Sequence, residues 1–417
     1  MGDLDPRAFP LRGRRVVLGV GGGIAAYKAA ELARLLMGAG AEVRAVMTPA
    51  AREFLTPLTL QTLTGHPVGT DLFDLGQESE IGHIRLAEQA DLVIVAPATA
   101  DLLARMASGM ANDLLTTLLL VTRAPVLLAP AMNVHMWSHE LVQENVRRLV
   151  GLGRIHLVGP DDGWLACRMT GPGRLAEPAD ILEAAGRLLV PHDLAGRSVL
   201  VTAGPTHEAL DPARYLANRS SGKMGHALAR AAAARGARVT LVTGPTALAA
   251  PLGVAVVRVT TALELEAAVS ARAAEQDLVV MAAAVADFRA ARAATKKLKK
   301  ATLGATPTIT LAENPDVLAG LGRARAERGA RLPVLVGFAA ETGRVTDEAR
   351  RKLVAKGCDL IVGNDVSRRD AGFATDTNRV TIVGPGKKLA RVPLATKDEV
   401  AHRILDAAAA LVSAARK

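Results

Sequence analysis

Apolar runs alternate with amphipathic stretches along most of the chain, and the alternation occurs twice. In the first half, apolar runs predict strands at 15–20, 42–47, 92–96, 126–129 and 155–158, and an amphipathic stretch predicts a helix at 24–39. In the second half, similar runs predict strands at 198–202, 238–242, 254–259, 278–282, 332–336 and 360–362. Strands that alternate with helices are typical of parallel α/β sheets.

The two halves also repeat each other. Each begins with a Gly-Arg pair before an apolar run, and ADLVIVAPATADL at 90–102 is echoed by QDLVVMAAAVADF at 276–288. We therefore expect an α/β protein with two Rossmann-like parallel-sheet domains, residues 1–190 and 191–417. The segment 284–310, which contains KKLKK and TPTIT, lacks a clean period and is expected to form a flap with a short hairpin arm.

Length and composition narrow the class of protein. A chain of 417 residues is expected to form at least two domains, because single cores rarely exceed about 300 residues. The apolar runs are too short to span a bilayer and the N-terminus lacks an apolar signal core, so a cytoplasmic protein without membrane contact is expected. The net charge is +10, but aromatic residues make up only 2% and offer few stacking platforms, which disfavours nucleic-acid binding.

The chain has only two cysteines, Cys167 and Cys358, which argues against a disulfide framework and against a cysteine-based metal site. Cys358 begins the apolar run CDLIV and is expected to be an inert core residue. Cys167 lies among glycines and arginines at 163–174, in what is expected to be a mobile basic loop able to close on an anionic substrate.

A glycine turn follows the first predicted strand. The sequence GGGIAA at 21–26 satisfies G-x-G-x-x-A between a strand and a helix, which is a dinucleotide-binding pattern. An acidic residue that would hold the ribose is missing from the end of the second strand, where Met47, Thr48 and Pro49 stand. The turn therefore suits a mononucleotide such as FMN, and the Thr48 hydroxyl can donate to its phosphate.

A second loop, AGPTHEALDPARYLANRSSGKMG at 203–225, joins a predicted strand to an alanine-rich helix. It is not a Walker loop, because Met224 follows Gly222-Lys223 where Ser or Thr is required. The amides of residues 220–224 would still lie at a helix N-terminus and favour an anion, with Ser220, Ser221 and Lys223 in support. The alternative for the SSG triplet alone is an ordinary Ser N-cap and glycine turn.

The loop at 203–225 closely resembles the signature of bacterial phosphopantothenate–cysteine ligases. The stretches GGGIAAYK, GHIRL, APATADL, GMANDLL and PAMNVHMW, at 21–28, 82–86, 96–102, 109–115 and 130–137, resemble flavin-dependent cysteine decarboxylases. Together these motifs cover almost the whole chain and resemble the bifunctional decarboxylase/ligase family of coenzyme A biosynthesis. The resemblance implies a flavodoxin-like flavoprotein domain followed by a Rossmann-like ligase domain.

The resemblance also implies two consecutive reactions. In the first, CTP with Mg²⁺ activates 4′-phosphopantothenate as an acyl-cytidylate, L-cysteine captures it, and CMP and pyrophosphate leave. In the second, FMN oxidises the cysteinyl thiol, so that the carboxylate leaves as CO2, and then returns the electrons to give 4′-phosphopantetheine. Family members are oligomers, so a homo-oligomer of up to a dodecamer is expected.

For the decarboxylase half, the resemblance assigns Cys167 as the proton donor, His83 to proton movement and Asn133 to the substrate carboxylate. It assigns flavin binding to Gly21, Gly22, Gly23, Ile24, Thr48 and Thr99. The chain departs from the family pattern at Gly21, where Ser or Thr is common, and at Arg168, where Gly is usual. Alternatives are a helix cap for Asn133 and a metal pair for His135 and His139, which lacks an adjacent third ligand.

For the ligase half, the resemblance makes Asn218 the residue that binds the acyl intermediate and Lys297 part of a lid over the triphosphate. The residues implied to bind CTP and 4′-phosphopantothenate are Arg214, Ser221, Gly222, Lys223, Met281, Ala282, Ala283, Asp287, Lys297, Pro315, Asp316, Val317, Leu318, Phe338, Lys352 and Lys356. Lys352 and Lys356 are spaced i, i+4, a mildly unfavourable like-charge pair that an anion would relieve. Alternatives are a solvated lysine run and a second half that binds without turnover.

Overall fold

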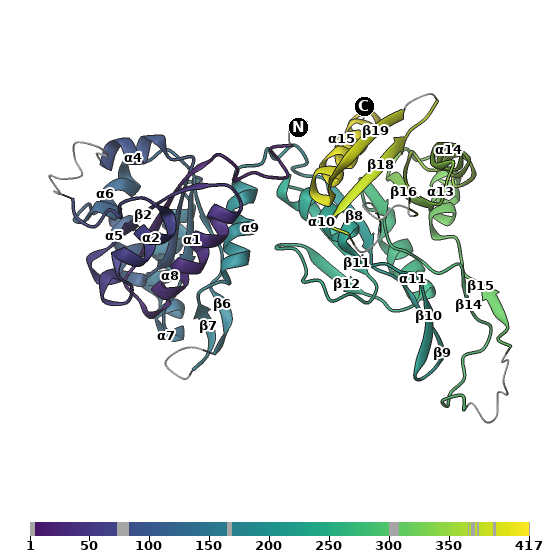
Figure 1. Ribbon diagram of the computed structural model, residues 1–417, viewed down its shortest axis with the longest axis horizontal. Helices are drawn as coiled ribbons and strands as arrows, with labels where there is room; N and C mark the ends of the chain where they lie inside the picture. The colour runs from purple at the N-terminus through teal and green to yellow at the C-terminus, as the bar shows by residue number, and fades with distance from the viewer. Residues whose placement is uncertain are drawn as a thin grey trace. The chain divides into compact units, whose positions relative to one another are not determined.

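A computed structural model of the protein shows two compact units (Figure 1). One unit is Phe9–Val190, and the other is Pro191–Lys417 together with Met1–Ala8. The structure describes residues 5–72, 83–164, 169–299, 308–365, 367, 372, 375–386 and 389–416, and of His83 only the backbone. No helix in these ranges is long and apolar enough to cross a membrane.

The Phe9–Val190 unit is built on a five-stranded parallel sheet. Its strands are β1 (Arg15–Val20), β2 (Glu42–Met47), β3 (Leu92–Ala98), β4 (Val126–Pro130) and β5 (Ile155–Leu157). Every residue of β3 and β4 is buried, as expected of central strands whose sheet is covered on both faces. The order β2-β1-β3-β4-β5 is that of flavodoxin-like folds, which bind their ligand where the strand order reverses, between β1 and β3.

Helices and one antiparallel strand pair complete this unit. They are η1 (Ile24–Tyr27), α1 (Lys28–Gly38), η2 (Pro49–Glu53), α2 (Pro57–Thr64), α4 (His83–Gln89), α5 (Ala100–Ser108), α6 (Leu114–Val121), α7 (Val134–Ser138), α8 (Glu140–Val150), α9 (Pro178–Leu188), β6 (Asp161–Trp164) and β7 (Thr170–Arg174). The helix predicted at 24–39 is wrong at its start. Residues 24–27 form a tighter 3₁₀ turn because the Ala26 amide donates to the Gly23 carbonyl, 2.9 Å away, as the chain leaves the glycine turn.

The second unit has an eight-stranded sheet in the order β12-β11-β8-β13-β16-β17-β18-β19. Its strands are β8 (Ser198–Ala203), β11 (Arg238–Thr243), β12 (Ala255–Arg258), β13 (Leu278–Met281), β16 (Val334–Glu341), β17 (Leu360–Asp365), β18 (Thr377–Val383) and β19 (Leu389–Thr396). The first six along the sheet are parallel and follow the Rossmann order 3-2-1-4-5-6, whereas β18 and β19 are antiparallel. The strand order therefore reverses between β8 and β13.

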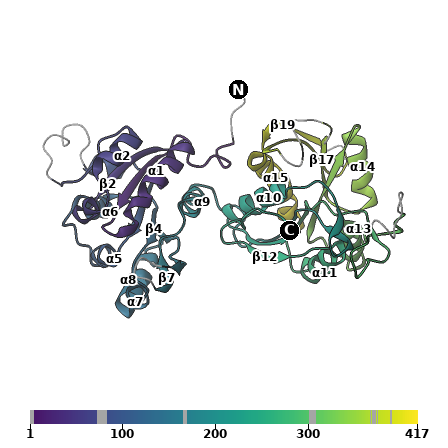
Figure 2. The same ribbon diagram turned by 60° about the horizontal axis from the view of Figure 1, so that its bottom comes forward.

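Helices cover both faces of this sheet (Figure 2). Buried side chains of α10 (Lys223–Ala234) and α15 (Lys397–Ala415) share one core cluster, and those of α11 (Ala262–Ala273), α13 (Val317–Glu327) and α14 (Val345–Ala355) share another. The fold class expected from the sequence, two Rossmann-like parallel-sheet units, is confirmed.

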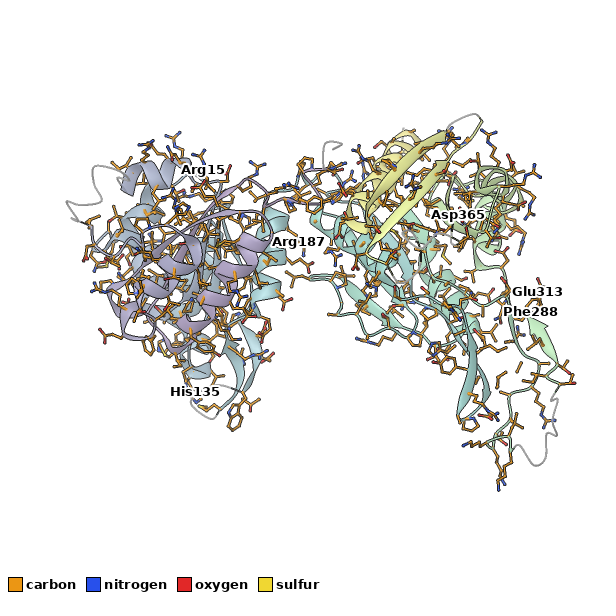
Figure 3. All side chains as sticks on the ribbon, in the orientation of Figure 1. Arg15, His135, Arg187, Phe288, Glu313 and Asp365 are labelled. Atoms are coloured by element: carbon orange, nitrogen blue, oxygen red, sulfur yellow. The ribbon has the colours of Figure 1, made fainter. Side chains whose placement is uncertain are left out.

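Two hairpins extend from the second unit (Figure 1). They are β9 (His207–Asp211) with β10 (Arg214–Ala217), and β14 (Phe288–Ala290) with β15 (Leu311–Glu313). Phe288 pairs with Glu313 in the second hairpin, which is the short arm expected within 284–310 (Figure 3). Residues 300–307 of that segment, including part of KKLKK, lie outside the described residues.

Candidate functional site

A first candidate site lies at the carboxyl ends of β1 and β3. Gly21 directly follows β1, and its amide donates to the Pro97 carbonyl of β3, 3.1 Å away. A Cβ atom added at Gly21 would lie 2.4 Å from that carbonyl oxygen, and one added at Gly22 would lie 2.3 Å from Ala50 Cβ. Because no side chain fits here, the backbone passes close to its neighbours and forms a cradle that suits a phosphate-bearing mononucleotide such as FMN.

The predicted threonines border this cradle. Thr99 follows β3 and caps α5, with its Oγ1 accepting from the Leu102 amide at 3.3 Å, and its methyl group lies next to the glycine turn. Thr48 follows β2, where its amide donates to Val20 and its buried Oγ1 accepts from the Ala51 amide at 3.2 Å. Each hydroxyl accepts in its cap and keeps its own proton to donate to a ligand. Ile24, which is 61% exposed, begins the following turn.

Asn133 follows β4 and forms the helix cap that the sequence allowed. Its Oδ1 accepts from the His135 amide at 2.8 Å, while its Nδ2 donates to Met169 Sδ at 3.7 Å, beside the start of β7. His139 is likewise a cap, with its Nδ1 accepting from Leu141. Among the residues that the structure describes, no group of three or more His, Cys, Asp or Glu side chains could hold a metal. The metal pair of His135 and His139 therefore gains no third ligand there.

Three predicted features of the decarboxylase half have no described side chain. Cys167 and Arg168 lie outside the described residues, between β6 and β7, and His83 begins α4 with only its backbone described. Their roles stay predictions. Cys358, in contrast, is buried in the second unit, and burial raises the pKa of its thiol to about 11, which makes it unreactive as expected.

A second candidate site is a cavity of about 600 Å3 in the other unit, at the carboxyl ends of β8 and β13. It lies at the crevice where doubly wound sheets bind their ligands. The cavity gathers most of the residues predicted for the ligase half, which come from five separate stretches of chain, 218–223, 281–287, 315–318, 338 and 352–356. These residues are Asn218, Gly222, Lys223, Met281, Ala282, Ala283, Asp287, Pro315, Asp316, Val317, Leu318, Phe338, Lys352 and Lys356.

The loop before α10 opens its helix N-terminus toward this cavity. Gly222 is the N-cap, with a left-handed φ of 79° that favours glycine, so the Ser N-cap considered from the sequence is wrong. Ser220 Oγ instead accepts from the Gly222 amide at 3.3 Å. A Cβ atom at Gly225 would lie 2.5 Å from Ala203 Cβ, so glycine lets α10 approach β8 closely. Asn218 spans the crevice by donating its Nδ2 to the Val285 carbonyl at 2.9 Å.

Lys352 and Lys356 both line the cavity. The sequence predicted unfavourable repulsion between these two like charges, but in the structure each lysine has a carboxylate partner. Lys352 Nζ lies 2.6 Å from Glu341, and Lys356 Nζ lies 3.5 Å from Asp316, which also caps α13. Each lysine is thus paired with its own carboxylate at the C-terminal end of α14, where a positive charge is favoured by the helix dipole. An incoming anion would compete with these carboxylates.

Three predicted residues do not line the cavity. The Arg214 guanidinium lies 2.5 Å from the Asp211 carboxylate, and its hydrogen bond to that carboxylate holds the pKa of Asp211 well below its usual range. The same guanidinium also donates to the Leu298 carbonyl at 2.7 Å. Ser221 presents its carbonyl to Thr246 at 3.0 Å. Lys297 is exposed on the segment between β14 and β15. Arg214 therefore anchors that segment to the β9–β10 hairpin.

The sequence analysis missed several polar residues of the cavity, notably Asn364, Asn378 and Lys397. Lys397 is only 6% exposed, and burial together with the charge of Lys223 lowers its pKa to about 8. Asn364 lies next to the carboxyl end of β17, the apolar strand that begins at Leu360, and this position could have indicated a site at the carboxyl edge of the sheet. Asn378 lies within β18 and Lys397 directly follows β19; the apolar pattern predicted neither strand, so no comparable signal was available for these two residues.

Two family profiles match the chain. The flavoprotein family matches residues 7–189, and the family described as DNA/pantothenate metabolism flavoprotein C-terminal domain matches residues 194–411. The fold and these matches define a two-unit α/β enzyme of the flavoprotein class.

Full-length relatives make the assignment more specific. The coenzyme A biosynthesis bifunctional proteins CoaBC of Escherichia coli K12 and Vibrio parahaemolyticus are 49% and 47% identical, each over 95% of this chain, covering 97% and 98% of their own lengths. The CoaBC protein of Mycobacterium bovis is 47% identical over 97% of both chains. A crystal structure of a CoaBC C-terminal domain is 37% identical, with a TM-score of 0.45, over 53% of this chain and 98% of that one.

The chain therefore belongs to the family of coenzyme A biosynthesis bifunctional proteins CoaBC. This membership confirms the family expected from the sequence and a bifunctional enzyme that performs two steps of coenzyme A biosynthesis. It also confirms that the N-terminal half is a flavoprotein.

Proposed function

We propose that residues 191–417 join 4′-phosphopantothenate to L-cysteine with CTP, and that residues 1–190 use FMN to decarboxylate the product to 4′-phosphopantetheine. The observation that carries the ligase assignment is the cavity of about 600 Å3 at the β8/β13 crevice, which gathers predicted residues from five stretches of chain. Family membership supports both assignments.

The ligase must make a carboxylate electrophilic. A carboxylate oxygen of 4′-phosphopantothenate attacks the α-phosphorus of CTP and pyrophosphate leaves; the cysteine amine then attacks the acyl carbon and CMP leaves. We assign the nucleotide to the side of the cavity that holds Phe338, Lys352 and Lys356. The amides at the N-terminus of α10, together with Asn218, lie where the acyl-cytidylate would form. Lys297 would cover the triphosphate from the arm.

Mg²⁺ is proposed to enter with the nucleotide. Carboxylates line the cavity at Asp287, Glu313 and Asp316, and carboxylate oxygen is the ligand type that Mg²⁺ prefers. Because the described residues form no ready cluster of three ligands, phosphate oxygens would complete the coordination. The ion would neutralise the charge that develops on the departing pyrophosphate.

For the decarboxylase, FMN would be held by the glycine cradle at Gly21 and Gly22, with Thr48 and Thr99 at its border. When bound, the flavin supplies reversible two-electron oxidation of the substrate thiol. Asn133 would orient the substrate carboxylate through its Nδ2. Cys167 would deliver the proton that completes the product, and His83 would move a proton in the oxidative half.

The state of assembly, the cellular location and the kind of ligand stay predictions. A homo-oligomer of up to a dodecamer and a cytoplasmic location are expected from the resemblance and the sequence. The expected ligands are small molecules rather than nucleic acid.

The test is mass spectrometry of the products that the full chain forms from 4′-phosphopantothenate, L-cysteine and Mg²⁺, with CTP or ATP and added FMN. We expect 4′-phosphopantetheine with CTP. Cys167→Ser should stop the pathway after ligation, without releasing 4′-phosphopantetheine. Unchanged substrate with both nucleotides would refute the ligase assignment and favour a second half that only binds.

A lysine pair in the arm offers a sharper test of Lys297. Lys297→Gln should slow ligation at least tenfold if this side chain covers the triphosphate, because a charge-assisted contact is worth about 1.5–3 kcal/mol. Lys296→Gln, the neighbouring change in the same run, should slow it less than twofold. Equal effects of the two substitutions would indicate that the lysine run is an ordinary solvated surface and that Lys297 has no special contact with the triphosphate.

A further inference from the structure

Arg174, the last residue of β7, carries a buried donor that the proposed chemistry leaves without a role. Its Nε is buried and has no hydrogen-bond partner in the part of the chain that the structure describes. The guanidinium packs over Gly163 of β6, where an added Cβ atom would lie 3.0 Å from that Nε. An unpaired buried donor is costly, so the position of this side chain calls for an explanation other than stability.

Arg174 holds together carboxylates from two elements. Its Nη1 lies 2.9 Å from Glu177, the N-cap of α9, and its Nη2 lies 3.7 Å from Asp161, the first residue of β6. Asp180 adds a third carboxyl group, whose pKa is raised by burial and by the charges of Asp161 and Glu177. Because these acids repel one another, the Arg174 cation is needed to keep the start of β6 next to the start of α9.

Glu177 extends this network to the flavin cradle. Its Oε2 lies 3.2 Å from the Nζ of Lys28, a side chain that is only 17% exposed. Lys28 begins α1, directly after the 3₁₀ turn that leaves the glycine cradle. A chain of alternating charges thus runs from Lys28 through Glu177 and Arg174 to Asp161. An isolated exposed ion pair contributes little, but charges that share their partners in a network can hold a defined geometry.

On its other side, β7 holds the loop that presents Asn133. The amide of Met132, which precedes Asn133, donates at 2.9 Å to the carbonyl of Gly173, which precedes Arg174. β7 also packs against α7 (Figure 1), and an added Cβ atom at Gly171 would lie 2.8 Å from the first side chain of that helix. Because the two segments are in such close contact, a displacement of β7 moves Asn133 as well.

We infer that Arg174 is a positioning residue of the decarboxylase, which acts through the hydrogen bond between Met132 and Gly173 to set where Asn133 meets the substrate carboxylate. Glu177 ties the other end of this connection to the helix that follows the cradle, so the carboxylate contact keeps its place relative to the cradle. Such placement matters, because a shift of about 1 Å can slow a reaction by about 100-fold. The inference rests on the proposed decarboxylation, in which Asn133 orients that carboxylate.

The test supplies 4′-phosphopantothenoylcysteine directly to the full chain with FMN, so that the ligase half is not needed, and measures 4′-phosphopantetheine by mass spectrometry. Arg174→Met keeps an alkyl stem over Gly163 but removes the charge, and kcat should fall about tenfold or more. The flavin content, measured by visible absorbance, should stay unchanged. Arg174→Lys, which keeps the charge, should recover part of the loss. Arg148→Met removes an exposed arginine of α8 in the same unit and should leave kcat within about twofold.

A second background shows whether Arg174 acts through Asn133. Arg174→Met should cost about tenfold in kcat by itself but less than about twofold when it is added to Asn133→Ala, because the effects of coupled residues do not add. Equal losses in the two backgrounds would show that Arg174 acts independently of Asn133, and would overturn the inference. A loss of flavin in step with kcat would overturn it too, because Arg174 would then be a structural support of the cradle.

Hydrogen exchange gives a measurement that does not depend on residual activity. The Met132 amide should exchange faster in Arg174→Met than in the unaltered chain, whereas the amides of β1, which leads into the cradle, should exchange as before. Unchanged exchange at Met132 would contradict the inference. Failure of the proposed function has a different signature: the unaltered chain then forms no 4′-phosphopantetheine from the supplied substrate, while the difference in exchange persists.

Discussion

Gly22 shows how much of the flavin site depends on one missing methyl group. A Cβ atom there would lie 2.3 Å from Ala50 Cβ and 2.7 Å from the Ala50 carbonyl carbon, both in the chain after β2. Gly22→Ala must therefore push the turn away from η2, and we expect flavin affinity to fall at least tenfold. The visible absorbance of flavin in the purified protein measures how much flavin is retained.

The matched control is Gly38→Ala at the end of α1, where an added Cβ meets nothing within 4 Å. It should retain flavin as the unaltered chain does, because alanine is the better helix former. Equal flavin content in both variants would show that the cradle does not hold the cofactor.

The sequence predicted those site residues that belong to a recognisable local pattern. Gly21 and Gly222 stand in turns between a strand and a helix, and both lie at a strand-order reversal. The sequence did not predict Lys397 as a cavity residue, because a lysine at the start of a helix is usually exposed to solvent, and its burial is seen only in the structure. It also misjudged Lys352, whose partner Glu341 lies 11 residues away on a neighbouring strand.

At the scale of elements, Gly225 fixes the distance between α10 and β8. A Cβ atom would lie 2.5 Å from Ala203 Cβ and 2.8 Å from the Thr202 carbonyl oxygen. Gly225→Ala should move the N-terminal turn of α10 and destabilise the second unit by about 1–3 kcal/mol, the usual cost of overpacking. Hydrogen exchange of α10 amides measures the loss. Ligase activity should fall as well, because this turn borders the cavity.

Gly320→Ala in α13 is the control for this change. An added Cβ meets nothing within 4 Å there, so exchange in the second unit should stay equal or slow slightly. Faster exchange in both variants would mean that helix glycines matter for a reason other than the approach of α10 to β8.

The parallel strands could be predicted because they are buried on both faces and read as continuous apolar runs. β1 and β2 have the predicted bounds. β16 is different: the strand predicted at 332–336 starts at Val334 and continues to Glu341, with its later residues at the cavity. β18 and β19 were missed because neither reads as a continuous apolar run: β18 mixes buried residues with more exposed ones, and β19, the edge strand, buries only Val392.

At the scale of the whole molecule, the two ends of the chain meet in the second unit. Arg7 forms ion pairs with Asp5, at 2.8 Å, and with Asp406 of α15, at 2.6 Å. His402 lies beside them, 3% exposed, and its Nδ1 has no hydrogen-bond partner within the described part of the chain. Burial, with a smaller contribution from Arg7, lowers the pKa of His402 from 6.5 to about 4. The folded state therefore holds this imidazole neutral.

This arrangement predicts acid sensitivity in two steps. Between pH 6.5 and 4, His402 is protonated in the unfolded chain but not in the folded one, so the second unit loses about 3 kcal/mol of stability as the pH falls through that range. Below it, Asp5, whose pKa is lowered to about 2, gives up the stabilising contribution of its carboxylate between pH 3.8 and 2. His402→Leu should remove the first step and leave the second.

Hydrogen exchange of α15 amides is the measurement to use, because both tryptophans, Trp137 and Trp164, lie in the other unit and their fluorescence does not report on this one. In the unaltered chain, α15 protection should weaken from pH 6.5 to 4 after correction for intrinsic exchange; in His402→Leu it should stay level. His135→Gln, an exposed histidine of the flavoprotein unit, should leave the weakening in place. If His402→Leu keeps the full pH dependence, other groups cause it, and the buried imidazole does not link the stability of the C-terminal helix to pH.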